Sequence, residues 1–244
     1  MIGILNLSFG KFKGQILNDL PDGHGTLNYI NGDSYEGNFL RGKRNGVGMI
    51  KLRDGSSYKG EFENDLIHGK GEYKWKEGHK YIGQFEKCKK HGQGKMVYSN
   101  GDVYEGQFVN GKRQGQGKAR YSEGTKYDER GRYTTGACYV GEWFNDKRHG
   151  YGIYRFSNGD VYKGNFKEGF MHDEEGDYRE ASTGNYYFGN FKFGKKHGYG
   201  TYYCSKDKSV YSGLFLDDKK AIEENIDVYE QKHLDLGLIL RKRI

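Results

Sequence analysis

The sequence predicts an all-β protein: an elongated, twisted antiparallel meander of stacked β-hairpins, with a short helix at the C-terminal end. Glycine supplies 40 of the 244 residues, aromatic residues make up 16% and proline occurs once. Glycine costs about 1 kcal/mol at a helix-interior position, which argues against a helical bundle. Collagen needs proline and a three-residue glycine period, and disordered chains are poor in aromatic residues. A β-rich chain with many turns is what remains.

The N-terminal segment, residues 1–11, is predicted to be a strand or cap that precedes the main pattern. It lacks the basic start and long apolar run of a signal peptide, and no apolar stretch of the chain is long enough for a membrane-spanning helix. Cys88, Cys138 and Cys204 are odd in number and widely spaced, which predicts neither a disulfide framework nor a metal site. We therefore expect a cytoplasmic protein with reduced thiols.

A sequence repeat of 23 residues extends over most of the chain. Its marker is an aromatic residue followed at the second and fourth positions by a glycine and another aromatic residue. The marker begins at Tyr35, Tyr58, Tyr81, Tyr104, Tyr139, Tyr162, Tyr187 and Tyr211, with a weaker copy at Phe12. Most copies continue with a Gly-x-Gly pair; the seventh copy lacks it and the ninth stops early. Residues 12–216 are therefore predicted to hold eight repeats and a terminal half.

Each repeat is predicted to be a β-hairpin. The aromatic, glycine and aromatic positions fall at i, i+2 and i+4, which is one face of a strand. A turn such as residues 41–45 follows, and the second strand alternates in the same way. The hairpin closes on a dipeptide such as Asn31-Gly32, which favours a tight turn because both residues tolerate positive φ. Sheet order is expected to follow chain order.

The glycines are expected to make room for the rings. A bulky aromatic side chain on one strand needs space over the neighbouring strand, and a glycine there supplies that space while the ring covers its backbone. Each repeat then contacts mainly its neighbours, as in a solenoid. A continuous seam of stacked rings, rather than a large central core, is predicted to stabilise the fold.

Two blocks, YEGQFVNGKRQGQG from Tyr104 and YFGNFKFGKKHGYG from Tyr187, resemble the MORN repeat (membrane occupation and recognition nexus). The resemblance covers residues 12–216 at a fixed period. It implies an elongated β-ribbon with a scaffolding role, and it favours a radial-spoke-head-like or other ciliary or cytoskeletal member. Some relatives carry a lipid kinase or SET methyltransferase domain. The residues after 216 are too few for such a domain, so those activities do not transfer.

Two segments interrupt the repeats. An insertion near 123–136 is polar and contains glycine, which predicts a surface loop. It is either a tolerated insertion or a partner-specific contact. The degraded repeat near 171–180 is acidic where other copies carry Gly-x-Gly. We expect it to bend or loosen the ribbon.

The tail, residues 217–244, is predicted to be helical. Ile222, Ile226 and Tyr229 fall at i, i+4 and i+7, which is typical of an amphipathic helix. Such a tail either caps the last open strand or docks another protein; the cap is favoured.

Two sets of residues are candidates for binding a partner. An aromatic face, expected to receive an extended peptide or helix, consists of Tyr35, Phe39, Tyr58, Phe62, Tyr81, Phe85, Tyr104 and Phe108. A basic edge consists of the pairs Lys43 and Arg44, Lys89 and Lys90, Lys112 and Arg113, Lys147 and Arg148, and Lys195 and Lys196. At a net charge of +7 this edge suits acidic proteins or anionic lipids, or it is a row of solvated lysines that deters aggregation.

The recurring polar residues predict no chemistry. The Gly-x-Gly pairs open strands, whereas a dinucleotide site needs Gly-x-Gly-x-x-Gly between a strand and a helix. Histidines also recur, but hairpins about 9.6 Å apart separate them too far for zinc ligands at about 2.0–2.1 Å. We therefore predict no catalytic residue, metal, cofactor or small-molecule substrate. Nucleic acid is not expected, because the aromatic residues are committed to packing.

The sequence thus predicts a non-enzymatic scaffold or adaptor that binds other proteins of a large axonemal or cytoskeletal assembly. By the family resemblance, the expected location is the cytoplasm and cytoskeleton, with the axoneme of a cilium or flagellum as the setting. The alternative is a peripheral membrane protein that binds anionic phospholipids through the basic edge.

Overall fold

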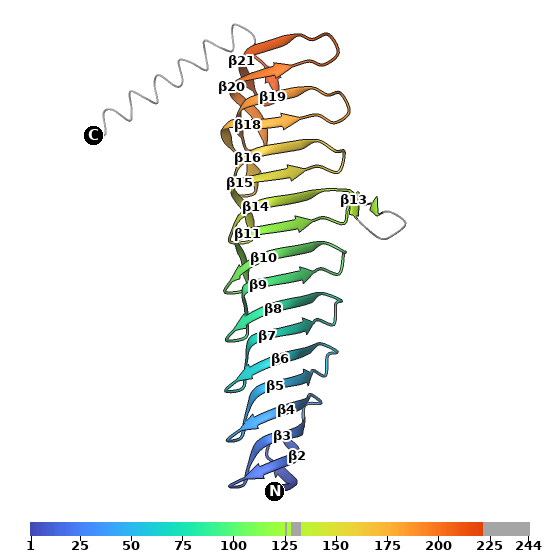
Figure 1. Ribbon diagram of the computed structural model, residues 1–244, viewed down its shortest axis with the longest axis vertical. Coiled ribbons are helices and arrows are strands. Elements are labelled where there is room, and N and C mark those ends of the chain that lie inside the picture. The colour runs from blue at the N-terminus through green and yellow to red at the C-terminus, as the bar shows by residue number, and fades with distance from the viewer. Residues whose placement is uncertain (125, 128–132, 222–244) are drawn as a thin grey trace, which may run out of the picture. The chain divides into compact units, whose positions relative to one another are not determined.

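The computed structural model describes residues 1–124, 126–127 and 133–221, and in those ranges the chain forms strands and turns but no helix (Figure 1). The chain divides into two compact units. Unit 1 comprises Met1–Thr125 with Glu142–Asp146, and unit 2 comprises Lys126–Gly141 with Lys147–Ile244. The predicted all-β class is confirmed for the described residues.

Unit 1 is an antiparallel meander in which each strand pairs with the strand before and after it. Its strands are β1 (Ile2–Leu7), β2 (Gly10–Leu17), β3 (Leu20–Tyr29), β4 (Ser34–Leu40), β5 (Lys43–Lys51), β6 (Ser57–Glu63), β7 (Leu66–Lys74), β8 (Lys80–Glu86), β9 (Lys89–Val97), β10 (Val103–Val109) and β11 (Lys112–Arg120). The N-terminal strand predicted within residues 1–11 is β1.

Unit 2 repeats the meander, with an irregularity at β17 and β18, both of which pair with β16. Its strands are β15 (Lys147–Arg155), β16 (Val161–Lys167), β17 (Phe170–Met171), β18 (Asp173–Arg179), β19 (Tyr186–Lys192), β20 (Lys195–Tyr203), β21 (Val210–Leu216) and β22 (Lys219–Lys220). The residues of β14 (Cys138–Phe144) divide between the two units.

The insertion near 123–136 differs from the predicted loop. Its described part contains two short strands, β12 (Lys126–Tyr127) and β13 (Tyr133–Thr135), which pair antiparallel. These strands form a sheet of their own. A polar, glycine-containing insertion in this chain is therefore not purely irregular.

The predicted hairpins are confirmed, with a shorter turn than expected. β4 pairs with β5 so that Gly37 faces Gly48. The turn between them consists of Arg41 and Gly42, with φ angles of 50° and 83°. A two-residue turn with positive φ at both positions matches the twist of paired strands. The residues from Lys43 onward therefore belong to a strand and not to the turn.

The hairpin pattern continues past the boundary predicted at Leu216. Asp217 and Asp218 have φ angles of 47° and 72°, and β22 pairs back on β21 with Leu216 opposite Lys219. The ninth copy therefore begins its second strand where a helical tail was predicted to start. The rest of that predicted helix, residues 222–244, lies outside the described residues.

The core of each unit is a ladder of aromatic rings on one side of the sheet. From here on, the aromatic face means this whole side of the sheet. Tyr58 contacts Phe62 of its own repeat and Phe85 of the next edge-to-face, with ring centroids 5.2 Å apart in both pairs. Such pairs add about 0.5–1.5 kcal/mol each beyond the burial of their area. Stability is therefore contributed repeat by repeat, as the predicted seam of rings requires.

Facing glycines beneath each tyrosine explain the strict spacing of the repeat. A Cβ at Gly71 would lie 2.4 Å from the Tyr58 ring, and a Cβ at Gly60 would lie 2.4 Å from the Tyr58 hydroxyl oxygen. The hydroxyl donates a hydrogen bond to the Glu61 carbonyl oxygen at 3.0 Å, and burial raises the pKa of Tyr58. The ring thus occupies the space that two side chains would fill.

The other glycine of each Gly-x-Gly pair lies in a β-bulge. The pairing of β6 with β7 shifts between Gly60 and Phe62, and Gly69 in the bulge has a φ of 62°, which favours glycine. The Glu61 carboxylate accepts a hydrogen bond from the Lys70 backbone N–H at 3.0 Å. This bond ties the bulge to the preceding strand.

Candidate functional site

The aromatic residues predicted to form a partner-binding face are buried in the core. They are Tyr35, Phe39, Tyr58, Phe62, Tyr81, Phe85, Tyr104 and Phe108, and their exposed fractions run from 0% to 6%. The prediction of a contact surface made of these side chains is wrong, because each ring packs against glycine backbone and against rings of adjacent repeats. Aromatic residues on one side of a strand give the same sequence pattern whether that side is a buried core or an exposed binding face.

The predicted basic edge separates into two rows on opposite faces of the sheet. The first members of the pairs are exposed: Lys43, Lys89, Lys112, Lys147 and Lys195. The second members are partly buried on the aromatic face: Arg44, Lys90 and Arg113 in unit 1, and Arg148 and Lys196 in unit 2. Successive residues of a strand point to opposite faces, so these pairs cannot form the single edge that was predicted. The second members are named here the cation row.

Each member of the cation row lies over aromatic rings. The guanidinium carbon of Arg44 is 5.3 Å from the Phe62 ring centroid, and that of Arg113 is 4.3 Å from the Trp143 ring. A contact of this kind contributes about 0.5–2 kcal/mol, more where the cation is desolvated. The cation row therefore covers the aromatic core and is part of the fold as well as part of the surface.

The cation row continues at Lys220, which was not predicted from the sequence. Its ammonium nitrogen is 4.8 Å from the Tyr211 ring and 5.5 Å from the Tyr202 ring. A signal was present, because Lys219 and Lys220 follow Tyr211 at the spacing that the other basic pairs keep from their first aromatic residue. The assignment of residues 217–244 to a helical tail concealed it.

Beside the cation row of unit 1, one row of side chains on the aromatic face stays partly exposed: Tyr29, Leu52, Trp75, Tyr98 and Tyr121. The Lys90 ammonium lies 6.0 Å from the Trp75 ring. The His79 ring stacks edge-to-face on Tyr98 at 5.9 Å. These side chains and the cation row belong to the part of the aromatic face that another molecule can reach.

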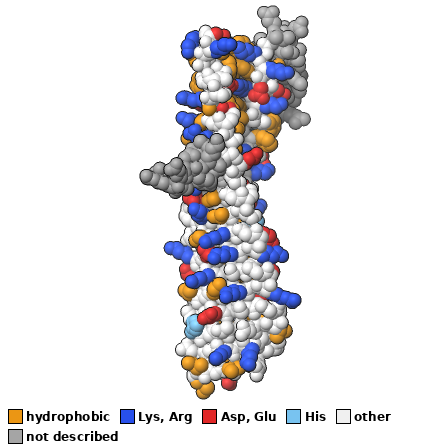
Figure 2. Space-filling view, turned by 90° about the vertical axis from the view of Figure 1, so that its right-hand side faces the viewer, with side chains coloured by type: hydrophobic (Ala, Val, Ile, Leu, Met, Phe, Trp, Pro, Cys, Tyr) orange, Lys and Arg blue, Asp and Glu red, His pale blue; other side chains and the backbone are white. Residues whose placement is uncertain are grey.

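The space-filling view shows basic side chains interleaved with hydrophobic ones on the surface of both units (Figure 2). Tyrosine, tryptophan and arginine are the residue types enriched in protein–protein interfaces.

The degraded seventh repeat retains one glycine of its pair, which was not predicted. Gly176 faces Gly189 in the ladder, as Gly71 faces Gly83 in the third repeat. A Cβ at Gly176 would lie 2.6 Å from the Phe191 ring. The available signal was the spacing, because a glycine precedes the aromatic residue of the second strand by two positions in both repeats.

An extra residue enlarges the bulge of the seventh repeat. No residue from His172 to Glu175 has a positive φ, so the bulge needs no glycine. Asp173 ties it to β16 by accepting a hydrogen bond from the Asn165 backbone N–H at 2.6 Å, and it also accepts one from the Glu175 N–H at 3.2 Å. Burial raises the pKa of Asp173, but these hydrogen bonds outweigh burial and hold it below its ordinary value.

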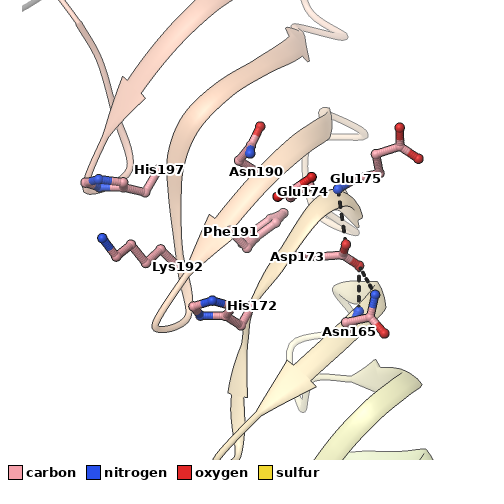
Figure 3. Close-up of a pocket in the computed structure, with 9 residues that line it drawn as sticks. All are labelled: Asn165, His172, Asp173, Glu174, Glu175, Asn190, Phe191, Lys192 and His197. Carbon is pink, nitrogen blue, oxygen red and sulfur yellow. Dashed lines mark hydrogen bonds between the residues drawn. The ribbon is translucent and has the colours of Figure 1, made fainter. Parts of the chain in front are cut away.

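A cleft of about 630 Å³ opens at this enlarged bulge. His172, Lys192 and His197 lie on one side of it, and Asp173 and Glu174 lie on the other (Figure 3). The Asp173 carboxylate is engaged in the bulge, and none of the residues that line the cleft is a serine, threonine or cysteine. The cleft therefore offers no hydroxyl or thiol nucleophile.

The structure describes residues 1–124, 126–127 and 133–221. No three histidine, cysteine, aspartate or glutamate side chains there are placed to hold a metal ion. No helix there is suited to crossing a lipid bilayer.

The fold and its accessible side chains define a repeat protein: hairpins of one kind follow one another within each unit, and the candidate binding residues recur from hairpin to hairpin. The MORN-repeat pattern matches the chain over residues 12–34, 35–57, 58–80, 81–103, 104–126, 139–161, 162–172 and 187–208. These matches cover more than half of the chain, which belongs to the MORN-repeat family. The short seventh match ends where the enlarged bulge begins. No curated protein matches the chain.

Proposed function

We propose that this MORN-repeat protein is a non-catalytic scaffold that binds other proteins through the accessible part of its aromatic face. MORN repeats suggest a role in binding proteins or membranes. The observation that supports a protein partner is the partly exposed Trp75 beside Lys90, with a partly exposed Tyr98 in the equivalent position of the next repeat.

Large aromatic side chains next to a cation suit a protein partner for a physical reason. Rings of Trp75 and Tyr98 contribute much apolar area at little cost in side-chain entropy. The neighbouring cations make the contact specific for one orientation of the partner, because a charged group requires an oppositely charged group opposite it. Residues that recur with the repeat do not suit a single reaction centre, so the proposed activity is binding without catalysis.

The proposed setting is a ciliary or flagellar axoneme, where the protein would hold components of a radial-spoke-like or other cytoskeletal complex together. The family resemblance supports this setting. Axonemal proteins bind their partners in permanent assemblies, and a protein with repeated contact sites is suited to such binding.

The experiment uses isolated axonemes and the purified full-length protein. The wild-type protein is expected to co-sediment with salt-extracted axonemes in a saturable manner, and the double variant Trp75→Glu, Tyr98→Glu is expected to lose this binding. Glu180 occupies the equivalent position in the seventh repeat, so a glutamate is compatible with the strand. The control is Ile82→Glu, which places one glutamate on an exposed side chain of β8.

Each outcome separates two parts of the proposal. Equal co-sedimentation of the double variant and the control would contradict the role of the aromatic face. A fluorescently tagged protein that stays outside cilia, together with no saturable binding to axonemes, would contradict the axonemal setting.

A second candidate function, binding to anionic phospholipids, is favoured by one feature of unit 2. Phe170 and Phe193 lie at neighbouring hairpin ends, 51% and 64% exposed, with ring centroids 6.4 Å apart. Phe193 has a φ of 49°, a conformation that is costly for a bulky residue. Lys192 and Lys195 beside it are exposed. Exposed rings flanked by lysines are typical of segments that enter the headgroup region of anionic membranes.

Vesicle flotation tests this second function. Wild-type protein is expected to float with vesicles that contain phosphatidylserine at low salt, and less so at high salt because screening weakens the attraction. Phe193→Asn should reduce flotation, while Leu40→Asn, which removes an exposed apolar side chain at a hairpin end of unit 1, should not. Flotation that is equal for both variants would exclude this tip as the lipid contact.

A further inference from the structure

Two arginines of the cation row form an ion pair with an aspartate in the turn of the next hairpin. Nε of Arg44 lies 3.2 Å from Oδ1 of Asp65, and Nε of Arg113 lies 3.2 Å from Oδ1 of Asp146. Each guanidinium also donates to the carbonyl oxygen of the same aspartate at 2.7 Å. An internal ion pair therefore completes the cation site in these two repeats.

Lys90 and Arg148 face a turn with glycine in the aspartate position. The Gly111 N–H donates to the Lys90 carbonyl oxygen at 2.8 Å, and the Gly169 N–H donates to that of Arg148 at 3.0 Å. The Asp65 N–H donates the equivalent bond to the Arg44 carbonyl oxygen of the preceding hairpin at 3.0 Å. Arg148 donates to the Gly169 carbonyl oxygen at 2.8 Å. Within the described ranges, neither cation has a carboxylate within ion-pair distance.

The Lys90 ammonium is consequently a partly desolvated charge without an ionic partner among the residues that the structure describes. It lies 5.2 Å from the Phe108 ring and 6.0 Å from the Trp75 ring, and burial lowers the pKa of Lys90. The charged groups that act on it are Asp146 and Arg113, which are paired with each other. Contacts with rings replace only part of the hydration that an ammonium loses.

The space for the missing carboxylate is open. A Cβ at Gly111 or at Gly169 would meet no heavy atom of the described residues within 4 Å. These glycines have φ angles of 87° and 91°, and Asp65 and Asp146 adopt 69° and 68° in the equivalent position. The turn therefore tolerates an aspartate, and its absence leaves room beside the cation for a side chain from another molecule.

We propose that Lys90 is a binding subsite for a carboxylate of a partner protein. An aspartate or glutamate of an extended acidic segment enters the open space beside Gly111 and completes the ion pair that Asp65 completes within the chain. This inference rests on the proposed protein-binding function and names the chemistry of the partner at that surface.

The surroundings of Lys90 favour a peptide as the occupant. The open space corresponds to one aspartate side chain, and the partly exposed rings of Trp75 and Tyr98 suit apolar side chains of the same segment. Arg148, beside Gly169, is the equivalent subsite in unit 2. Lipid binding by these residues is an outcome that the experiment distinguishes.

The experiment selects peptides from a random phage-displayed library on the full-length protein and measures the affinity of the synthesised peptides. Enriched sequences are expected to share an acidic residue at one position beside apolar residues. Lys90→Met should weaken their binding about tenfold or more, since the charge-assisted hydrogen bond to the carboxylate is lost. Methionine is compatible with this position, because Met171 occupies it in the seventh repeat.

A matched pair of variants supplies the sharpest test. Gly111→Asp places a carboxylate of the chain itself beside Lys90 and should weaken peptide binding about tenfold by occupying the subsite. Gly111→Asn has the same size and tolerates positive φ but carries no charge, so it should leave affinity within about twofold. Peptides that bind equally to these two variants, or an enriched set without a shared acidic residue, would overturn the inference while leaving protein binding itself intact.

Two further results would also count against the subsite. If no peptide is enriched above the unselected library, the extended acidic segment is not the occupant, whereas binding to axonemes tests the broader function independently. If Lys90→Met weakens flotation with phosphatidylserine vesicles but not peptide binding, the cation serves lipids and the proposal is wrong.

Discussion

In the third repeat, in unit 1, Tyr58 lies over Gly60 and Gly71, and Gly69 in the bulge has a φ of 62°. In the seventh repeat, in unit 2, Tyr162 lies over Gly164 and Gly176, and the longer bulge has no residue with positive φ. The comparison separates two requirements that the Gly-x-Gly motif combines. The ring requires the second glycine in both repeats, whereas only a short bulge requires the first.

The same contrast explains why the seventh repeat keeps its ladder although its motif is degraded. Its second strand has lost the motif but not the glycine that faces Gly189. The enlarged bulge is tied by the carboxylate of Asp173, whereas in the third repeat Glu61 of the preceding strand ties the bulge. The first of four predictions tests this comparison directly, and the other three follow in order of decreasing effect.

The largest expected effect is that of Gly71→Ala. Its Cβ would lie 2.4 Å from the Tyr58 ring, which is held by its neighbours, and overpacking of a core costs about 1–3 kcal/mol. We expect a loss of about 3 kcal/mol in the free energy of unfolding, measured by urea denaturation. Gly176→Ala should show a comparable loss, because the second glycine is required in both repeats. Gly111→Ala, which meets open space, is the control and should cost about 1 kcal/mol through its positive φ.

The next effect concerns acid stability in unit 2. Burial raises the pKa of Asp160, but hydrogen bonds from Tyr178, Ala181 and Asn158 at 2.7, 2.8 and 2.9 Å outweigh it, so the pKa lies below the ordinary 3.8. A lowered pKa in the folded state means that stability is present above about pH 4 and is lost as pH falls through the folded value. Asp160→Asn should cost about 2 kcal/mol at neutral pH.

Denaturation at neutral pH and at about pH 3 measures this effect. The Asp160→Asn variant should lose less stability between the two conditions than the wild-type protein. An identical loss would show that Asp160 does not contribute to acid sensitivity.

A smaller effect is expected from exchanging turn residues between the two units. Phe193 and Asn110 occupy the same turn position, each before a glycine, with φ angles of 49° and 50°. Asparagine tolerates this conformation better than phenylalanine by about 1 kcal/mol. Phe193→Asn should therefore leave stability unchanged or raise it by up to about 1 kcal/mol, and Asn110→Phe should lower it. A large loss in Phe193→Asn, seen as a lower Tm, would mean that its ring contacts outweigh the backbone preference.

The smallest effect concerns a side chain that links adjacent hairpins. In unit 1, the His79 Nδ1 accepts a hydrogen bond from the Ser99 backbone N–H at 2.9 Å, and Asp33 and Asp102 make equivalent bonds in other repeats. His79→Asp should preserve this link, and His79→Phe should lose about 0.5–1 kcal/mol. Urea denaturation of both variants measures the difference, and equal stabilities would show that the link contributes nothing.

Much of the fold could be predicted from residue spacing. The 23-residue period, the aromatic, glycine and aromatic strand and the tight turns indicate hairpins in chain order, because strand periodicity and turn chemistry are local. The candidate site could be predicted only in part. The Lys43 and Arg44 pair was recognised as basic, but its division between two faces depends on a turn of only two residues. Lys220 was missed because its strand lies beyond the last recognised glycine motif.

By itself, the sequence determined the class of repeat, the ring-and-glycine packing and the absence of the strong helix patterns from most of the chain, since these follow from side-chain size and local backbone preference. Only the tertiary structure decided which aromatic residues are buried, which cations lie over rings, and which of those cations receive an aspartate from the next hairpin. The reason is that burial and ion pairing depend on register between neighbouring strands, and one residue of shift moves a side chain to the other face.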